Sequence, residues 1–287
     1  MPHLYLSSVV ISSPLSWRGV GGEASNELIM SNISEKAHVS PKAKIGNNVT
    51  IYPFAYIEDD VVIGDDCVIY PYVSIMNGTR MGRGNRVFQN TVLGAEPQDF
   101  NYKGDASQLV IGDENIFREN VVINRATFSD GQTVIGNRNF FMEGVHVSHD
   151  TKVRSYCTFG YGTKVAGDCE IFNGVIFSSS VIVNPGVRVG GGSMVTSGVR
   201  ISKDVPPFIV ATHNPVTYGG INRKILEDLG TPENVIGHVA NAYRLVFHGQ
   251  TSLFDAIHQI KDQVPDGREV GIIVKFLEET KGIIAKM

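Results

Sequence analysis

Residues 43–69 read AKIGNNVTIYPFAYIEDDVVIGDDCVI, and every sixth residue in this stretch, from Ile45 to Ile69, is isoleucine. The six-residue period extends from Val39 to Ile201, with interruptions at Pro97 and at 127–132. An α-helix repeats every 3.6 residues and a flat strand every two, so neither produces a period of six. The pattern predicts a chain that turns a corner after every six residues and buries one apolar side chain each time.

These buried anchor positions, none of which is polar, are Val39, Ile45, Ile51, Ile57, Ile63, Ile69, Ile75, Met81, Val87, Leu93, Ile111, Phe117, Ile123, Ile135, Phe141, Val147, Val153, Phe159, Val165, Ile171, Phe177, Val183, Val189, Val195 and Ile201. Glycine often follows the anchor, as at Gly46, Gly64 and Gly82. We expect these glycines to permit corner backbone angles that a Cβ would penalise. They lie eighteen residues apart, so three hexads make one coil.

This six-residue pattern of anchor positions, called the grid below, resembles that of the hexapeptide-repeat proteins. That resemblance implies a mainly β fold, a left-handed parallel β-helix with triangular coils, in which stacked repeats bury a core that one repeat cannot bury alone. The β-sandwich alternative would alternate with period two and carry turns every eight to twelve residues.

The end of the grid suggests a division of the chain. We assign residues 31–204 to the β-helix domain, with a loop insertion at 97–108, and residues 205–287 to a linker and a small C-terminal helical domain. We expect residues 205–222 to be irregular. Thr231 is a predicted helix N-cap with Pro232 at the first helical position, and a second helix is expected after Ser252.

Residues 1–30 lie outside the pattern, and we expect them to be a poorly ordered extension. The net charge of −4 argues against nucleic-acid binding. No apolar run in the sequence reaches the length of a membrane-spanning segment. Cys67, Cys157 and Cys169 all fall on the small position two residues before an anchor, which is typical of buried thiols rather than disulfides or a metal cluster.

Residues 95–108, AEPQDFNYKGDASQ, leave the grid completely. Gln98, Asp99, Asn101 and Lys103 are the polar candidates in this stretch. A loop that leaves a β-helix adds nothing to the core and often covers a site. The alternative interpretation is a tolerated insertion.

Residues 145–150, VHVSHD, carry two histidines beside an inward anchor. Because Val147 points inward, His146 points outward and His149 lies at the outer corner with Asp150 after it. A histidine oriented by a carboxylate is a candidate general base. One coil later, Gly167 offers an unshielded N–H as an oxyanion donor. The alternative is solvated surface histidines, and no third histidine is available to complete a metal site.

The span 31–284 resembles the acyl-carrier-protein-dependent UDP-N-acetylglucosamine O-acyltransferases of lipid A synthesis. The resemblance is carried by landmarks in order along the chain: PQDFNYKG, IGDENIFRENVVINRAT, FFMEGVHVSHD, TKVAGDCEI, KDVPPFIVATHNP, YGGIN and NAYRLVF. It implies a cytoplasmic homotrimer with active sites in the clefts between prisms and no cofactor. It also implies transfer of a 3-hydroxyacyl group from acyl carrier protein to the glucosamine 3-hydroxyl.

The resemblance also implies roles for individual residues. His149 matches the catalytic base, Asp150 the residue that orients it, and Gly167 the oxyanion donor. His146 matches a second active-site histidine. The predicted substrate-binding residues are Gln98, Asp99, Asn101, Lys103, Asp168 and Asn222.

Some positions depart from the familiar pattern. Asn101 replaces a lysine, Asp168 a histidine and Asp228 a phosphate-binding arginine. Phosphate could instead be met by Lys103, Arg223 or Lys224. For the acidic carrier protein, the candidate dock is the row Arg80, Arg83 and Arg86. The alternatives are another hexapeptide acyltransferase, with a different nucleotide sugar or an acyl-CoA donor, and a divergent non-catalytic β-helix.

Overall fold

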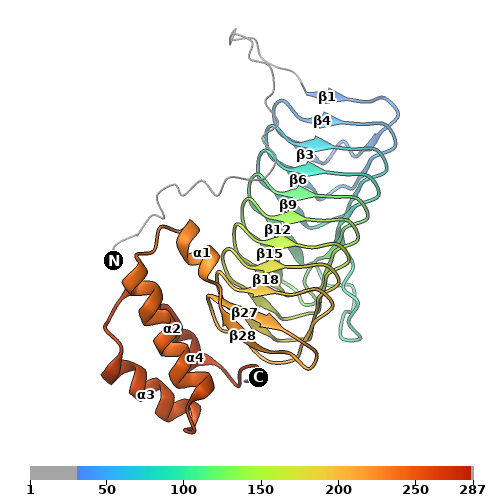
Figure 1. Cartoon of the computed structure of the whole chain (residues 1–287). Helices are drawn as coiled ribbons and strands as arrows, with labels where there is room; N and C mark the ends of the chain where they lie inside the picture. The colour runs from blue at the N-terminus through green and yellow to red at the C-terminus, as the bar shows by residue number, and fades with distance from the viewer. Residues whose placement is uncertain (1–30, 286–287) are drawn as a thin grey trace, which may run out of the picture.

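The computed structural model describes residues 31–285 as a left-handed parallel β-helix followed by a small helical cap (Figure 1). The three faces of the triangular prism are three sheets, called here A, B and C. The expectation for the 1–30 extension lies outside the described residues.

Sheet A has eleven strands: β1 (Asn32–Ile33), β4 (Thr50–Ile51), β7 (Val68–Ile69), β10 (Arg86–Val87), β13 (Ile116–Phe117), β16 (Phe140–Phe141), β19 (Thr158–Phe159), β22 (Ile176–Phe177), β25 (Met194–Val195), β27 (Ile209–Thr212) and β28 (Thr217–Ile221). Sheet B has nine: β2 (His38–Val39), β5 (Tyr56–Ile57), β8 (Ser74–Ile75), β11 (Val92–Ala95), β14 (Val122–Asn124), β17 (His146–Val147), β20 (Lys164–Val165), β23 (Ile182–Val183) and β26 (Arg200–Ile201). Sheet C has eight: β3 (Lys44–Ile45), β6 (Val62–Ile63), β9 (Thr79–Met81), β12 (Gln108–Ile111), β15 (Gln132–Ile135), β18 (Lys152–Val153), β21 (Glu170–Ile171) and β24 (Arg188–Val189).

The predicted anchors form the core. All of them are buried except Val39 and Ile45, which are half-buried. Those two belong to the first strands of sheets B and C and so have a neighbouring strand on one side only. The anchors of sheet A include a stack of Phe117, Phe141, Phe159 and Phe177, with ring centroids 4.9, 4.6 and 5.2 Å apart.

The glycines after the anchors serve a different purpose from the one predicted. At Gly64 an added Cβ would come within 2.6 Å of the backbone of Gly82 in the next coil, so the constraint is close approach rather than backbone angle. The left-handed conformation occurs two residues further on, for instance at Asp66, where φ is 60°. The expectation that glycine relieves corner angles was therefore wrong for this column.

The expectation of irregular structure at 205–222 was also wrong. β27 continues sheet A by pairing with β25, and β28 then returns antiparallel to β27. Short strands that lack the six-residue pattern gave no signal in the sequence. The proposed domain boundary at 204/205 stays a prediction.

Four helices follow the hairpin: α1 (Arg223–Asp228), α2 (Glu233–His248), α3 (Leu253–Gln263) and α4 (Arg268–Glu279). Ser252 caps α3 as predicted, accepting a hydrogen bond from the amide of Asp255. The N-cap of α2 is Pro232 rather than Thr231, because Pro232 has extended backbone angles. Tyr218 of β28 stacks on Phe247 of α2 at 4.2 Å, which fixes the cap to the last turns of the prism.

Candidate active site

The predicted catalytic residues lie at the corner between sheets B and C. β17 ends at Val147, which is fully buried, and the chain turns through His149 and Asp150 before β18 begins. Asp150 has a φ of 58°, in the left-handed region that Asp tolerates better than most residues. Its amide donates to Thr133 Oγ1 at 2.8 Å, which holds the turn against the preceding coil.

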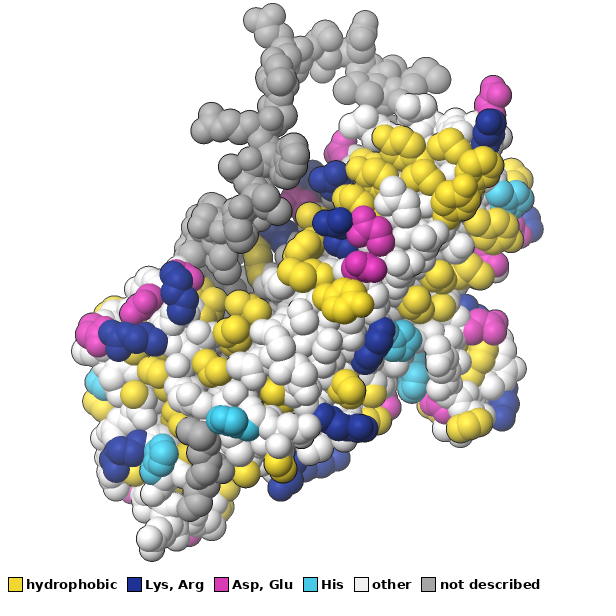
Figure 2. Space-filling model, turned by 45° about the vertical axis from the view of Figure 1, so that its right-hand side comes forward, with side chains coloured by type: hydrophobic (Ala, Val, Ile, Leu, Met, Phe, Trp, Pro, Cys, Tyr) yellow, Lys and Arg dark blue, Asp and Glu magenta, His cyan; other side chains and the backbone are white. Residues whose placement is uncertain are grey.

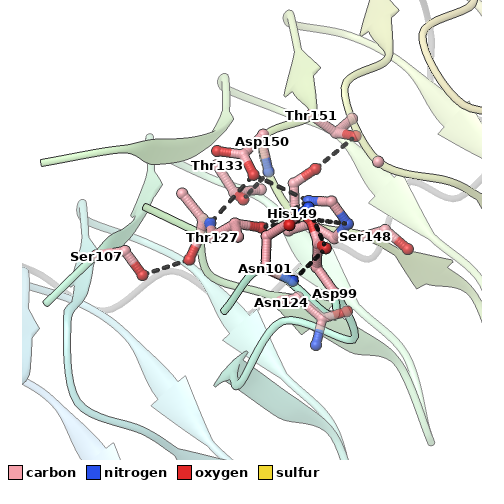
Figure 3. Close-up of polar contacts among 12 residues, drawn as sticks. Asp99, Asn101, Ser107, Asn124, Thr127, Thr133, Ser148, His149, Asp150 and Thr151 are labelled. Carbon is pink, nitrogen blue, oxygen red and sulfur yellow. Dashed lines mark hydrogen bonds and ion pairs between the residues drawn. The ribbon is translucent and has the colours of Figure 1, made fainter. Parts of the chain in front are cut away.

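His149 and Asp150 form a hydrogen-bonded pair (Figure 3). Nδ1 of His149 lies 2.9 Å from Oδ2 of Asp150. A carboxylate can only accept, so this contact assigns the proton to Nδ1 and leaves the lone pair of Nε2 free. The arrangement is that of a general base oriented by a carboxylate.

The loop between β11 and β12 reaches this corner (Figure 1). Oδ2 of Asp99 lies 3.9 Å from Nε2 of His149. The amide and side chain of Asn101 both donate to Oδ1 of Asp99, at 2.9 and 3.1 Å. The Asn101 amide, more than the nearby His149, holds the pKa of Asp99 below its usual range, and desolvation opposes this shift. The loop therefore brings a second carboxylate to the base.

Gly167 lies directly against the ring of His149. A Cβ at this position would sit 2.5 Å from Cε1 and 2.7 Å from Nε2 of His149, so only glycine fits. The carbonyl of Gly167 accepts from the amide of Gly186 at 3.0 Å. Within residues 31–285 its own N–H has no hydrogen-bond partner. An unpaired N–H beside a base is the arrangement that an oxyanion site requires.

His146 is half-buried on the outer face of sheet B. Its Nε2 lies 2.9 Å from the hydroxyl of Ser148. Burial lowers the pKa of His146, and the charges of Lys164 and His149 lower it further. His146 is therefore a neutral neighbour of the base near pH 7.

The remaining loop candidates are exposed. Gln98 projects to solvent, and Nζ of Lys103 donates to the carbonyl of Phe100 at 3.0 Å. The side chain of Asn101 is occupied in holding Asp99. Of the four loop residues predicted from the sequence, Asp99 alone contacts His149 or its partners among the described residues.

Asp168 and Asn222 do not join the His149 cluster. Asp168 is exposed at the same corner one coil on, and its amide donates to the carbonyl of His149 at 3.1 Å. Asn222 is the N-cap of α1, and its Nδ2 donates to the carbonyl of Gly192 at 2.9 Å. Gly192 lies between β24 and β25, so Asn222 lies at the corner between sheets C and A of its own chain.

A groove of about 620 Å³ begins at the catalytic corner. Asp150, Asp168 and Pro185 line one end, and Lys203 and Lys281 lie toward the C-terminal segment. His149 and His146 are not in its wall. The groove therefore begins beside the His149–Asp150 pair, with Asp150 in its wall and His149 outside it.

The sequence analysis did not identify three residues near His149, namely Asn124, Arg125 and Thr127, although the landmark IGDENIFRENVVINRAT contains them. Asn124 donates to the carbonyl of Glu96 at 2.6 Å. Arg125 donates to the carbonyl of Gly94 at 3.0 Å and to the Tyr102 hydroxyl at 2.5 Å. Thr127, which is fully buried, touches both His149 and Asp150. The only signal in the sequence was that the interruption of the repeat begins at Thr127.

The candidate basic residues are largely engaged elsewhere. Arg80 lies on sheet C, paired with Asp60 at 2.6 Å, while Arg86 lies on sheet A, so the predicted arginine row does not form one dock. At the start of α1, Arg223 pairs with Glu227 at 2.8 Å and with Glu233. Lys224 pairs with Asp228. Exposed ion pairs of this kind are weak, and an anion can displace them.

Some hydrophobic side chains remain at the surface over the first coils (Figure 2). Tyr52 stacks on Tyr70, and Phe54 on Tyr72, with ring centroids 5.2 and 5.3 Å apart.

Between residues 31 and 285 no group of three or more His, Cys, Asp or Glu side chains is arranged to hold a metal ion. The helices of that part of the chain include none with the length and apolar character needed to cross a membrane.

Comparison with known proteins gives a consistent result. A family described as UDP N-acetylglucosamine O-acyltransferase, domain 2, matches residues 204–284, and the bacterial transferase hexapeptide family matches residues 42–77. An acyl-[acyl-carrier-protein]–UDP-N-acetylglucosamine O-acyltransferase from Stutzerimonas stutzeri is 32% identical over 88% of this chain and 99% of its own length. The corresponding protein of Stenotrophomonas maltophilia is 34% identical over 87% of this chain and 95% of its own length.

Solved structures agree with the sequence matches. The crystal structure of a UDP-N-acetylglucosamine acyltransferase from Bacteroides fragilis superposes with a TM-score of 0.86 at 42% identity, covering 88% of this chain and all of that one. The Francisella novicida UDP-N-acetylglucosamine acyltransferase gives 0.85 at 32% identity, covering 88% and 94%.

Proposed function

This chain belongs to the acyl-[acyl-carrier-protein]–UDP-N-acetylglucosamine O-acyltransferase family, and from that premise we propose the reaction it performs and the residues that perform it. The enzyme transfers a 3-hydroxyacyl group from acyl carrier protein to the 3-hydroxyl of UDP-N-acetylglucosamine, the first step of lipid A biosynthesis. The observation that carries the assignment is the Nε2 atom of His149 beside the N–H of Gly167, neither of which has a hydrogen-bond partner within residues 31–285.

His149 acts as the general base. Nε2 takes the proton of the sugar 3-hydroxyl while that oxygen attacks the carbonyl carbon of the thioester. Asp150 keeps the other ring proton on Nδ1 and stabilises the imidazolium that forms. When the intermediate collapses, the carbon–sulfur bond breaks, and the leaving thiolate takes the proton back from Nε2.

Gly167 stabilises the negative charge that develops on the thioester oxygen. Its N–H needs no rearrangement to donate, because it has no other partner among residues 31–285. The absence of a Cβ brings the Gly167 backbone close to the His149 ring. Proton transfer and charge stabilisation thus occur at neighbouring atoms.

Asp99 and His146 complete the immediate surroundings of the substrate. Asp99 is ionised and lies beside Nε2, so it can accept a hydrogen bond from a polar hydrogen of the sugar. His146, kept neutral by burial, can offer either a donor or an acceptor to the acyl or sugar moiety. Gln98, Asn101, Lys103 and Asp168 are proposed as the outer contacts of the nucleotide sugar.

The proposed role of Asn222 supports a homotrimer. Asn222 lies at a different corner from His149, so its contact with substrate needs a second chain placed against the catalytic corner. Two further chains would make three equivalent clefts, each with a base from one subunit and Asn222 from another. We propose a cytoplasmic homotrimer that receives its acyl group from acyl carrier protein.

The test is a product assay with a panel of substrates. The protein is incubated with UDP-N-acetylglucosamine or its 3-amino analogue, together with 3-hydroxyacyl carrier proteins of several chain lengths or the matching acyl-CoA thioesters. Products are weighed by mass spectrometry. We expect O-acylated UDP-N-acetylglucosamine from the carrier-protein donors. Product formed only from acyl-CoA, or only on the amino sugar, would show that the protein is an acyltransferase with different substrates. The absence of product from every pair would support a non-catalytic β-helix.

A further inference from the structure

Thr127 is a fully buried residue that contacts both members of the catalytic pair and the carboxylate of the loop. It lies after the end of β14, two residues after Arg125, at the point where the repeat is interrupted. Its amide donates to Oδ2 of Asp150 at 3.1 Å. Its hydroxyl oxygen lies 3.0 Å from Nδ1 of His149 and 3.4 Å from Oδ2 of Asp99 (Figure 3).

We propose that Thr127 is a positioning residue whose hydroxyl keeps His149 in the tautomer that can accept a proton and links that tautomer to the loop through Asp99. This inference rests on the proposed role of His149 as general base. It concerns a residue that touches the base and both carboxylates and need not touch substrate.

The Thr127 hydroxyl and the His149 ring have only a few hydrogens to share among several acceptors. The Thr127 hydroxyl has one hydrogen, and Nδ1 of a neutral His149 has one or none. If the hydroxyl donates to Asp99, its oxygen is free to accept from Nδ1–H, which also donates to Asp150. Every donor is then used, and Nε2 carries a lone pair toward the substrate.

The opposite arrangement is unfavourable and unproductive. If the hydroxyl donated to Nδ1, the ring proton would have to move to Nε2, which could then accept nothing from the sugar. A bare Nδ1 lone pair would also face Oδ2 of Asp150 at 2.9 Å, two acceptors in contact. The position of Asp99, by attracting the Thr127 hydrogen, favours the productive form.

The loop is held where this link can form. Arg125, the residue two before Thr127, donates to the carbonyl of Gly94 and to the hydroxyl of Tyr102. Asn101 fixes Asp99 from within the loop. The other charged or titratable groups around the ring are Asp150, His146, Lys164 and Asp168, and none of them touches the Thr127 hydroxyl among the described residues. Asp99 is thus the acceptor available to it beyond the catalytic pair.

Thr127→Val and Thr127→Ser test the hydroxyl. Valine keeps the shape and the amide bond to Asp150 but removes the hydroxyl, whereas serine keeps the hydroxyl and removes the methyl group. We expect Thr127→Val to lower kcat about tenfold to a hundredfold with little change in KM, a fraction of the full contribution of a general base. Thr127→Ser should recover kcat to within about threefold of the wild type.

A spectroscopic measurement makes the result specific. In protein labelled with ¹⁵N-histidine, the two ring nitrogens of His149, assigned by their loss in His149→Ala, report which one is protonated. We expect an Nδ1-protonated ring in the wild type and in Thr127→Ser, and an increased Nε2-protonated fraction in Thr127→Val. Thermal unfolding shows that each variant is folded.

The outcomes are distinguishable. A wild-type kcat and an unchanged His149 tautomer in Thr127→Val would overturn the inference. So would an equal loss of kcat in Thr127→Val and Thr127→Ser while the His149 tautomer stays the same in both. If the wild type transfers no acyl group, the proposed function fails. The nitrogen signals would then still decide whether Thr127 sets the tautomer.

Discussion

Two corners of the same prism differ in how often the amide two residues after the anchor is paired. At the corner between sheets C and A, this amide donates to a side chain of the next coil at Asn47, Arg83, Asp113, Asn137 and Ser155. Three successive examples are Arg83 to Asp113 at 2.9 Å, Asp113 to Asn137 at 2.7 Å and Asn137 to Ser155 at 2.9 Å. At the corner between sheets B and C, the equivalent amides of His149 and Gly167 have no partner in residues 31–285.

The difference distinguishes a structural corner, between sheets C and A, from the proposed functional corner, between sheets B and C. Buried amides are almost always paired, because an unpaired N–H loses the hydrogen bond it made to water. At the corner between sheets C and A, five of these amides are paired with side chains of the next coil. At the corner between sheets B and C, the amide of the buried Gly167 has no such partner in residues 31–285, and it lies beside a histidine that is hydrogen-bonded to a carboxylate. One repeat template thus supplies both the rigid frame and the site.

Among the variants that compare the two corners, the largest effect is expected from Gly167→Ala, which fills the functional corner. In Gly167→Ala the added Cβ would meet the ring of His149 at 2.5 Å and force it away from Gly167. We expect kcat/KM to fall by about a hundredfold or more, comparable to the loss of one oxyanion donor. Steady-state kinetics with the carrier-protein donor measure the change.

Gly237→Ala is the matched control. Nothing lies within 4 Å of a Cβ added to this glycine of α2. The variant should keep wild-type kinetics and gain a little stability, since alanine favours a helix. If Gly167→Ala behaved in the same way, the base would not need the space that the glycine leaves.

The second effect should appear at the structural corner. Asn115 is fully buried, donates to Gly136 and to Asn85, and accepts from the amide of Asn139 at 2.9 Å. Asn115→Ala leaves these groups unpaired, so we expect a loss of about 1–3 kcal/mol in the free energy of unfolding. Denaturant unfolding measures this change. kcat per folded molecule should stay at the wild-type value.

The half-exposed Asn241 of α2 provides the control for that substitution. Asn241→Ala removes one contact to Arg244 and should change stability by less than about 0.5 kcal/mol. An Asn115→Ala variant that lost activity without losing stability would show that the two corners are not separable.

The smallest effect concerns pH. Burial lowers the pKa of His146 below the ordinary histidine value of 6.5. Below that pH, His146 binds a proton in the unfolded chain but not yet in the folded protein. Its contribution to the free energy of unfolding is therefore greatest above about pH 6.5 and declines as the pH falls toward the lowered pKa. The melting temperature should therefore drop less between pH 7 and pH 5 in His146→Gln than in the wild type. Equal drops would mean that His146 is not the group responsible.

The sequence predicted the frame more completely than the site. The six-residue period identified the anchors because each coil repeats the same burial. It also separated His146 and His149 from the core, since Val147 between them had to point inward. His149, Asp150 and Gly167 do lie together, and Asp99 joins them.

Other features could not be read from a single chain. The contacts of Thr127 connect residues more than twenty positions apart across an interruption of the repeat, so no spacing rule predicts them. The hairpin of β27 and β28 has no repeat to reveal it. The cross-coil bonds of Asn115 depend on side chains that resemble any surface asparagine in the sequence.

We propose that His149, at the functional corner between sheets B and C, is required for catalysis and that the rest of the prism provides stability. The most direct test compares His149→Ala with His38→Ala, a histidine on β2 that stacks on Tyr56. We predict that His149→Ala lowers kcat by a factor of about 10²–10⁴ and leaves the melting temperature unchanged. His38→Ala should keep the wild-type kcat. Turnover near wild type in His149→Ala, with the protein folded, would contradict the account.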